Sequence, residues 1–392
     1  MSIALLYERS ETDEMGIKLT AQDMGIDLVF IPFRKIALAI SKNGFTAKTK
    51  GKDHTQTFKD VTVVLNRAQS KNRRIQAGYL MEMLGKKTIN SSQIEFICYS
   101  KLRTLLHFWV EGIPIPKTVY VPCDAIDTLR SGRGIHNEKD IADLLQGEIT
   151  LDEGIVIKPD AGTHGKGAVL SRNRDQLVAS IRGIKPSIIN PVGITAQELV
   201  EKWFYDLRII VYKEKGKSPV CHPVALARGG MKDFRTNTYL GNTVFDAKLP
   251  AQVKEFAIKC GKSLGNESEV WLFALDAMVN IGENKSFNET ELRSELEKAS
   301  AAFEQPRKVK ADETRLRDFP SWNRKLEAAF LTYMSSEPYS TVKSIIEESM
   351  EKNVKGIVFH EANSCPEFWE HTRLIAGINL AVPLLKCAQS II

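Results

Sequence analysis

The stretch IVIKPDAGTHGKGAVL at residues 155–170 decides the fold of this chain, because it has the pattern of a strand, a glycine-rich turn and a second strand. Lys158 lies near the end of the first strand, and Lys166 lies inside the turn. The turn also holds three glycines: Gly162, Gly165 and Gly167. Glycine lets a backbone close tightly around a ligand, and the N–H groups can then donate to phosphate oxygens. The stretch favours a phosphate-covering hairpin, with an ordinary hairpin carrying an exposed lysine as the alternative.

Two familiar phosphate-binding motifs do not fit this turn. A P-loop requires a serine or threonine directly after its lysine to bind Mg²⁺, whereas Gly167 follows Lys166. The dinucleotide fingerprint G-x-G-x-x-G opens a helix, whereas the sequence AVLS follows here and predicts a strand. The turn therefore joins two strands and belongs to neither class.

Length and composition limit the classes of protein to be considered. With 392 residues, of which 43% are hydrophobic and 26% charged, we expect a soluble protein of two or three domains. The six cysteines form no CxxC pair, which disfavours a zinc ribbon or a disulfide framework and favours the cytoplasm. The net charge of +6 is dispersed, no apolar run reaches the roughly 18 residues of a membrane helix, and the N-terminus reads as a strand rather than a signal peptide. We therefore expect neither a nucleic-acid nor a membrane partner.

Three kinds of pattern follow one another along the chain. Through about residue 90, short β-rich runs alternate with helical ones, as in a small βαβ sheet. From Tyr205 strands dominate, with one helix in PAQVKEFAIKCGKSLG. Within residues 283–353, apolar residues recur every three or four positions and predict three amphipathic helices. Strand character returns in GIVFHEAN and a helix closes the chain, so the fold class is α/β with α+β character.

Polar residues interrupt the strands at positions that suggest a binding site. AQELVEKWFYDLR places six candidate residues at and after a strand end: Gln197, Glu198, Leu199, Val200, Asp206 and Arg208. KDFRTN places Arg235 and Asn237 two residues apart, on one face if the chain is extended.

Two carboxylates lie in apolar strands, one in ALDAMV and one in FHEAN, where an unpaired charge is costly. Asp276, Glu361 and Asn363 supply oxygen atoms, which are the ligands that Mg²⁺ prefers. Glu361 and Asn363 fall on the same face of one strand. A magnesium site is therefore indicated, with a structural ion pair as the alternative for each carboxylate.

In this order, the motifs resemble those of the ATP-grasp carboxylate–amine ligases, most of all the branch that contains RimK and LysX. LNRAQSKNRRIQAGYLMEMLGKKTINSS resembles the L-N-R segment, helix and N-S turn of LysX-type ligases. CYSKLRTLLHFWVEGIPIPKT is similar to their C-x-D-K-x-x-T-x-x-x-L-x-x-x-G-x-P-x-P-x-T, and EANSCPEF to their E-V-N-x-x-x-E-F. The resemblance runs over most of the chain.

The chain departs from this family at three places. The family's aspartate before its lysine is Ser100 here, which leaves Lys101 as the matching ATP contact. The family's R-G-G after F-R-x-N is replaced by LGN at residues 240–242. The segment between Asp276 and Glu361 is much longer than the hairpin usual in the family, so it carries an insertion between two metal-bearing strands.

The resemblance implies an ATP-grasp fold in three parts. They are an N-terminal βαβ pre-ATP-grasp domain at residues 1–92, a central subdomain with the glycine-rich lid at 93–197, and a C-terminal subdomain at 198–392 with the helical insertion at about 283–353. We expect the insertion to form a compact helical subdomain for substrate docking or dimer contact, or simply to add surface. We also expect its replacement by a short Gly/Ser hairpin to preserve nucleotide binding, because closing a short loop costs little.

The resemblance also implies a role for each candidate residue. Lys101 and Lys158 would hold the α and β phosphates of ATP, under a cover formed by Gly162, His164, Gly165, Lys166 and Gly167. The hinge Gln197, Glu198, Leu199 and Val200 would meet the adenine, with Asp206 near the ribose and Arg208 beside it. Two Mg²⁺ ions, or Mn²⁺ in their place, would be held by Asp276, Glu361 and Asn363. An acyl phosphate would be steadied by Arg228, Arg235 and Asn237.

Three further side chains invite a catalytic interpretation that we do not favour. His164 and His371 could act as acid–base groups, but a loop or surface histidine is the simpler interpretation. Cys365 could be a nucleophile, but the mechanism needs none and cysteine is often buried as a small apolar residue.

The implied function is an ATP-dependent ligase in which a carboxylate attacks the γ-phosphate and an amine then captures the acyl phosphate, forming an amide or peptide bond. The expected partners are a small amino acid or peptide amine, a peptide or small acidic protein carboxylate, and further copies of the chain in a dimer or tetramer. A catalytically silent nucleotide-binding regulatory or scaffold protein of the same fold is the alternative.

Overall fold

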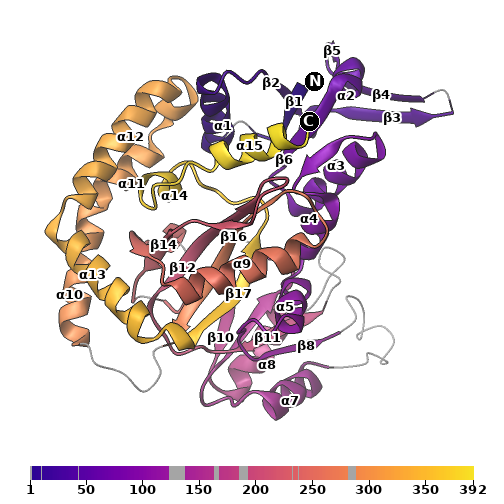
Figure 1. The fold of residues 1–392 in the computed structure, drawn as a ribbon. Coiled ribbons are helices and arrows are strands. Elements are labelled where there is room, and N and C mark those ends of the chain that lie inside the picture. The colour runs from indigo at the N-terminus through magenta and orange to yellow at the C-terminus, as the bar shows by residue number, and fades with distance from the viewer. Residues whose placement is uncertain are drawn as a thin grey trace.

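Three sheet-containing regions follow one another through the molecule (Figure 1). The computed structural model describes residues 2–9, 11–42, 44–122, 137–162, 167–184, 193–231, 233–236, 238–280 and 288–392, with the backbone alone for residue 239. In Figure 1 the N-terminal region is at the top, a small sheet is at the bottom, and the largest sheet lies between them. The two chain ends lie close together at the top. This arrangement of helices and sheets confirms the α/β class.

The first ninety residues form the predicted βαβ sheet. Four parallel strands pair in the order β2–β1–β6–β7. They are β1 (Ser2–Tyr7), β2 (Leu28–Pro32), β6 (Val61–Arg67) and β7 (Lys87–Ile89). The helices of this region are α1 (Thr12–Asp23), α2 (Thr55–Asp60) and α3 (Lys71–Met83). Strand residues such as Leu5 and Leu65 are fully buried, as expected for parallel strands covered by helices.

A small antiparallel sheet that the sequence pattern did not predict projects from this region (Figure 1). It consists of β3 (Ala37–Ser41), β4 (Gly44–Thr49) and β5 (Lys52–Asp53). Every residue of β3 is exposed, so the strand has no buried face and no alternation to reveal it. Gly44 has a φ of 118°, a conformation that favours glycine at the start of β4.

The second region is a four-stranded antiparallel sheet in the order β10–β9–β11–β8. Its strands are β8 (Thr118–Val121), β9 (Ile155–Pro159), β10 (Val169–Ser171) and β11 (Ile194–Glu198). The helices α7 (Glu138–Glu148) and α8 (Arg174–Ile184) pack on this sheet and share a separate apolar core with it. Because β9 and β10 are antiparallel neighbours, the two strands predicted within residues 155–170 are confirmed.

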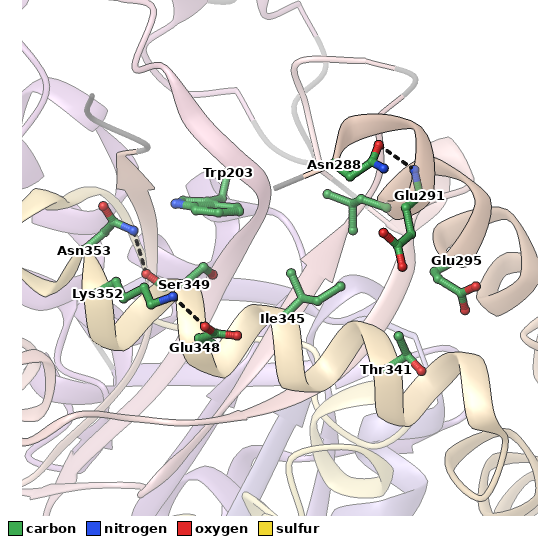
Figure 2. A pocket seen from close by; sticks show the side chains of 11 residues that line it. Trp203, Asn288, Glu291, Glu295, Thr341, Ile345, Glu348, Ser349, Lys352 and Asn353 are labelled. Carbon is green, nitrogen blue, oxygen red and sulfur yellow. Dashed lines mark hydrogen bonds and ion pairs between the residues drawn. The ribbon is translucent and has the colours of Figure 1, made fainter. Parts of the chain in front are cut away.

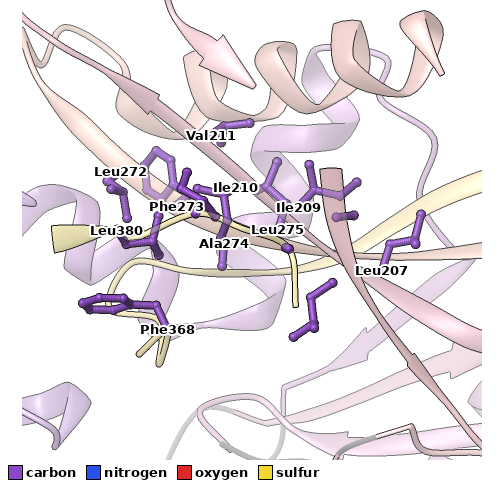
Figure 3. Packing of buried hydrophobic residues seen from close by; sticks show 14 of the residues in the cluster. Leu207, Ile209, Ile210, Val211, Leu272, Phe273, Ala274, Leu275, Phe368 and Leu380 are labelled. Atoms are coloured by element: carbon purple, nitrogen blue, oxygen red, sulfur yellow. The ribbon is translucent and has the colours of Figure 1, made fainter. Parts of the chain in front are cut away.

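The largest sheet follows the order β15–β14–β12–β16–β17, with the short β13 beside β12. Its strands are β12 (Lys202–Lys213), β13 (Val220–Cys221), β14 (Val224–Gly229), β15 (Thr243–Lys248), β16 (Trp271–Asn280) and β17 (Ile357–Asn363). Helix α9 (Ala251–Gly265) packs against β12 and β16. Figure 3 shows Ile209 and Ile210 of β12 packed beside Ala274 and Leu275 of β16. This fully buried pair of strands is the centre of the main core.

Two segments that the pattern predicted as single helices are each broken in two. The first gives α4 (Ser92–Tyr99) and α5 (Lys101–Val110), because Ser100 is extended and its side chain caps α5 by accepting from the Arg103 N–H. The second gives α14 (His371–Leu374) and α15 (Ala381–Ser390), with Gly377 at a φ of 73° between them. Across the described ranges, no helix has both the length and the apolar character to cross a bilayer.

The insertion leaves β16 and returns to β17, and these two strands are antiparallel neighbours. Four α-helices replace the predicted three: α10 (Glu289–Ala302), α11 (Glu304–Ala311), α12 (Phe319–Met334) and α13 (Glu337–Lys352). A 3-10 helix, η3 (Glu313–Leu316), joins α11 to α12. The first predicted helix of the insertion ends near Phe303, because Pro306 lacks the N–H that would donate to the carbonyl of Ala302.

The insertion covers the edge strand β15 of the largest sheet. Tyr333 donates its hydroxyl to the carbonyl of Val244 at 2.8 Å, and the N–H of Asp246 donates to the Tyr339 hydroxyl at 3.1 Å. The N–H of Lys248 donates to the Glu347 carboxylate at 3.0 Å. Side chains therefore satisfy the outward backbone groups that an edge strand otherwise exposes.

The apolar stripes of the insertion are buried, as expected for helices that cannot stand in water alone. The buried side chains belong to the same core as the largest sheet: Leu292, Leu296, Phe303, Leu326, Phe330, Val342, Ile346 and Met350. The Tyr205 hydroxyl of β12 lies 2.9 Å from that of Ser349 in α13. The insertion is therefore an integral layer of the C-terminal region.

A polar clasp joins the N-terminal sheet to the loop after β17. Arg67 donates to Asp13 and to the carbonyl of Pro366, each at 2.9 Å. Asp13 also accepts from the N–H groups of Phe368 at 3.1 Å and Trp369 at 2.8 Å. Arg67 is the arginine of the L-N-R motif, so this motif residue holds the two ends of the molecule together.

Candidate active site

A cleft between the four-stranded sheet β10–β9–β11–β8 and the largest sheet gathers most of the predicted site residues. The predicted residues that line it are Lys101, Lys158, Gly162, Gln197, Glu198, Leu199, Val200, Asp206, Arg228, Arg235, Asp276 and Glu361. They come from β9 and β11 on one side and from β12, β14, β16 and β17 on the other. Positions far apart in the sequence therefore meet in one place, as the motif order suggested.

Two lysines lie on the side of the cleft that is nearer the four-stranded sheet β10–β9–β11–β8. Lys158 of β9 donates to the Gln197 side chain of the neighbouring β11 at 2.6 Å. Lys101, at the first turn of α5, donates to the carbonyl of Gly162 at 2.8 Å and lies 3.8 Å from the Glu361 carboxylate. Burial, with the positive charge of Lys101 nearby, lowers the pKa of Lys158 to about 8. A buried ammonium of this kind is stabilised by any anion that enters the cleft.

The predicted hinge follows β11 and is tied to the backbone on both sides. The Glu198 carboxylate accepts from the Lys117 N–H at 2.8 Å, and the Leu199 N–H donates to the carbonyl of Gly154 at 3.0 Å. Val200 is buried at the cleft wall. The hinge backbone is thereby held in place between the two sheets.

Two arginines and two aspartates form a buried layer at the base of the cleft. Arg208 donates to both oxygens of Asp276 at 3.0 Å each, and Arg228 lies 2.7 Å from Asp206 and 3.2 Å from Asp276. The strand register produces this layer, because Arg208 faces Asp276 between β12 and β16 and Asp206 faces Arg228 between β12 and β14. Burial alone would raise the pKa of both carboxylates, but the arginines hold them below their usual range. We call these four residues the arginine–aspartate layer.

Glu361 lies directly opposite Asp276 on the neighbouring strand β17. Asn363 is two residues further on, with its Nδ2 3.5 Å from the Asp276 carboxylate. The two predicted metal-bearing strands are therefore adjacent. Burial would raise the pKa of Glu361, but Lys101 and Lys71 hold it below its usual value.

The carboxylate oxygens of Glu361 are more available to a magnesium ion than those of Asp276. Both oxygens of Asp276 already accept from arginines, whereas Lys101 is the only described residue that pairs with the Glu361 carboxylate. Among the described residues, no group of three or more His, Cys, Asp or Glu side chains comes together as a metal site. Oxygens from the phosphates of a bound nucleotide would complete the coordination, as is usual for Mg²⁺.

Two ionisable residues of the cleft were missed by the sequence analysis. His360 lies at an irregularity of the β16–β17 pairing and lines the cleft beside Glu361. Its Nε2 is buried without a hydrogen-bond partner among the described residues, and burial together with Lys158 lowers its pKa to about 4. Lys202, the first residue of β12, donates to the Thr236 hydroxyl at 3.3 Å. Lys202 could have been found from its position two residues after the hinge. His360 could not, because a bulge cannot be recognised from one sequence.

Several predicted positions lie outside the described residues. His164, Gly165, Lys166 and Asn237 are outside the described ranges. Gly167 has a φ of 78°, which favours glycine. Asp233 and Phe234 form a bend, and the Asp233 carboxylate accepts from both the N–H and the guanidinium of Arg235. The expected extended geometry between Arg235 and Asn237 is not tested, because Asn237 lies outside the described residues.

The other two residues considered for catalysis lie outside this cleft. His371 packs between Phe303 and Phe330 of the insertion, with ring centroids 6.0 and 5.9 Å away. Cys365 lies in the loop after β17, and burial raises the pKa of its thiol. A raised pKa disfavours the thiolate, so the interpretation of Cys365 as a small apolar residue is supported.

A separate groove lies between α10 and α13 and contains none of the predicted residues (Figure 2). Its charged side chains are mostly acidic: Glu291, Glu295 and Glu348, the last paired with Lys352 at 2.5 Å. The groove offers no cationic cluster for phosphates and is not the candidate active site.

Comparison with known proteins agrees with the geometry of the cleft. Residues 125–304 match the family described as the RimK-like ATP-grasp domain. The chain contains a RimK-like ATP-grasp domain. Of the curated proteins, the alpha-aminoadipate–LysW ligase LysX of Sulfurisphaera tokodaii is 27% identical, over 54% of this chain and 67% of that protein. A probable alpha-L-glutamate ligase of Pectobacterium carotovorum is 29% identical, over 47% of this chain and 53% of that protein.

Solved structures agree on the fold of this ATP-grasp protein. VanG D-Ala:D-Ser ligase from Enterococcus faecalis aligns with a TM-score of 0.56 at 13% identity, over 100% of this chain and 99% of that one. The ATP-grasp ligase PsnB in complex with a minimal precursor aligns with a TM-score of 0.52 at 10% identity, over 100% of each chain. At these identities the likeness shows the shared ATP-grasp fold alone.

Proposed function

We propose that this ATP-grasp protein is an ATP- and Mg²⁺-dependent ligase that forms an amide or peptide bond through an acyl phosphate. The observation that carries the proposal is the meeting of two lysines with a carboxylate pair on adjacent strands. Lys101 and Lys158 face Glu361 and Asp276 across a narrow cleft. Opposed cations and metal-type oxygens are what a Mg²⁺-bound triphosphate requires.

Each side of the cleft would contribute differently to phosphoryl transfer. Lys101 and Lys158 would neutralise the phosphates, and the backbone around Gly162 would cover them. Glu361 and Asn363 would hold Mg²⁺, which supplies charge neutralisation at the phosphates when bound. Arg228 and Arg235, which also line the cleft, would steady the acyl phosphate.

The ion pairs of the arginine–aspartate layer support this arrangement. Asp206 and Asp276 fix the guanidinium of Arg228 from two sides, so its position is set before a substrate arrives. The same pairing means that Asp276 would act on Mg²⁺ only after releasing part of its contact with Arg208. We therefore give Glu361 the main role in metal binding.

The proposed substrates are an amino acid or peptide amine and a peptide or protein carboxylate. LysX is named for alpha-aminoadipate and LysW, and the other relatives are named as glutamate ligases, which supports this substrate class. An oligomer of the chain also remains a proposal.

A catalytically silent nucleotide-binding protein of the same fold is the second candidate. Two observations favour this second candidate. The family's R-G-G is replaced by LGN at residues 240–242, and the Asp276 carboxylate already accepts hydrogen bonds from arginine. ADP release separates the two candidates, because only the ligase produces it with its substrates.

Binding of Mg·ATP is the first test, measured as a shift in melting temperature. A ligand at a hundred times its Kd stabilises a protein by about 2.7 kcal/mol, so millimolar Mg·ATP should raise the melting temperature. The wild-type protein, given Mg·ATP with a mixture of amino acids and acidic peptides, should then release ADP. The Glu361→Gln variant should retain the fold and release no ADP. Glu255→Gln, which changes an exposed glutamate on α9, is the matched control and should leave nucleotide binding unchanged. An absent thermal shift would disprove a nucleotide site, and full turnover by Glu361→Gln would place the metal elsewhere.

A further inference from the structure

A second cavity, of about 720 Å³, adjoins the candidate active site on the side of the insertion. This volume is within the roughly 300–1,000 Å³ range of small-molecule sites. Three parts of the chain form its walls: the start of α1, the segment from α11 to α12, and the loop that leads into α14. Arg228 lines both this cavity and the candidate active site, so the two spaces meet at the arginine–aspartate layer. We call this space the insertion cavity.

The wall of the insertion cavity is held by specific contacts between its three parts. Lys310 of α11 lies 2.5 Å from the Glu370 carboxylate, which also accepts from the Thr12 hydroxyl of α1 at 3.3 Å. Phe303 and Phe330 of the insertion pack against His371. The insertion is thereby fixed beside both the N-terminal region and the C-terminal loop.

Two arginines of the insertion cavity differ from its other cations. The cationic side chains that line it are Arg9, Arg208, Arg228, Lys310, Arg315 and Arg317. The first four have carboxylate partners, namely Glu11, Asp276, Asp206 and Glu370. Arg315 and Arg317, in and directly after η3, form no ion pair or side-chain hydrogen bond with any residue that the structure describes. They therefore present two uncompensated positive charges to the cavity.

Three of the four acidic residues that line the insertion cavity are paired with other cations, and the fourth, Glu367, is exposed. Asp13 is paired with Arg67, Glu11 with Arg9, and Glu370 with Lys310. Burial, and then the charge of Lys310, lower the pKa of His371 well below its usual value, while Glu367 opposes this shift. Leu316, between the two arginines, exposes 70% of its surface and adds an apolar contact at the same wall.

We propose that the insertion cavity binds the carboxylate substrate of the ligase as an acidic peptide segment, with Arg315 and Arg317 holding carboxylates that do not react. Arg228 lines the cavity where it meets the candidate active site, and the two arginines line it on the part of the wall formed by the insertion. A segment with at least two carboxylates would bring one to Arg228 while the others pair with the insertion. Guanidinium groups suit this task because they bind carboxylates through two parallel hydrogen bonds. The part of this inference that rests on the proposed function is the reaction of the carboxylate at Arg228.

The test is direct binding of a fluorescein-labelled Glu-Glu-Glu peptide to the full chain, with and without a non-hydrolysable ATP analogue. Fluorescence anisotropy at several salt concentrations gives Kd and its salt dependence. The variant is Arg315→Ala with Arg317→Ala. The matched control is Arg293→Ala with Arg324→Ala, which removes two exposed arginines of the insertion that do not line the cavity.

We expect the wild-type protein and the control to bind the peptide alike and the Arg315/Arg317 variant to bind it at least about tenfold more weakly, as for the loss of one charge-assisted contact. A Gln-Gln-Gln peptide should not bind. Equal weakening in the control would mean non-specific attraction, and an absence of binding to wild-type protein in both conditions would overturn the proposal. Stronger binding of an oligo-dT strand at the same arginines would also overturn it, in favour of a nucleic-acid partner.

The proposed function and this inference can fail separately. The thermal shift with Mg·ATP should be the same in wild-type protein and both double variants, because none of the four arginines lines the candidate active site. A normal Mg·ATP shift without peptide binding would reject the inference alone. Specific peptide binding without a Mg·ATP shift would reject the ligase and keep the acidic-peptide site.

Discussion

At the scale of the residue, burial turns Lys158 into a group that responds to pH near neutrality. The ammonium is surrounded by protein, lies near Lys101, and has the uncharged Gln197 side chain as its hydrogen-bond partner. These surroundings lower its pKa to about 8, so a fraction of the lysine is neutral in mildly alkaline solution. A triphosphate beside the lysine would favour the charged form and raise the pKa again.

Binding of Mg·ATP should therefore take up a proton and weaken above pH 8. In the free protein Lys158 loses its charge as pH rises through about 8, so binding must then include reprotonation, and affinity falls by up to tenfold per pH unit. Isothermal titration calorimetry from about pH 7.5 to 9.5, in buffers of different ionisation enthalpy, measures both effects. Lys158→Arg, which stays charged, should bind without proton uptake. An affinity that is constant over this range in wild-type protein would show that Lys158 does not hold the phosphates.

At the scale of the element, the edge strand β15 depends on side chains of the insertion. Its Val244 carbonyl accepts from Tyr333, and its Asp246 N–H donates to Tyr339. Neither interaction belongs to a sheet ladder, and both come from helices much later in the chain. The helices α12 and α13 therefore complete the hydrogen bonding of the sheet.

Tyr333→Phe should destabilise the protein by about 1–3 kcal/mol, because it leaves the buried carbonyl of Val244 without a donor. Urea unfolding measures this change as a lower midpoint with an unchanged slope. Tyr79→Phe is the control, since the Tyr79 side chain on α3 is 58% exposed. Equal stability of the two variants would mean that water replaces the tyrosine at the edge strand.

At the scale of the whole molecule, the insertion and the clasp make the three regions depend on one another. The insertion shares the main core with the largest sheet, and Asp13 and Arg67 tie the N-terminal sheet to the loop after β17. That loop continues from the strand of Glu361. The candidate active site is therefore built from segments that no single region holds in place.

The burial of the insertion argues against the expectation that a short hairpin can replace it. Loop closure is cheap, but excision of residues 283–353 would also uncover β15 and remove buried side chains such as Trp322, Phe330 and Tyr333. Loss of one large core aromatic costs about 3–5 kcal/mol, and total stability is about 5–15 kcal/mol. We expect the excised protein to show no cooperative unfolding by circular dichroism. A sharp transition together with a normal Mg·ATP shift would show that the insertion is dispensable.

The sequence by itself determined the order of the elements and much of the candidate site. The two strands within residues 155–170 could be predicted because glycines and alternating apolar residues act locally. The adjacency of Asp276 and Glu361 followed from two acidic positions in apolar strands, together with the family order of motifs. The helical character of the insertion followed from its spacing of apolar residues.

Only the tertiary structure decided which polar groups meet. The pairing of Arg208 with Asp276 and of Arg228 with Asp206 depends on the register between strands, which no local pattern encodes. The exposed strand β3 was missed because it buries no face. The proposed role of Arg315 and Arg317 depends on the position of η3, which lines one cavity together with the start of α1 and the loop that leads into α14. Periodicity records which face of an element is buried, whereas the partner of a charge depends on how distant elements pack.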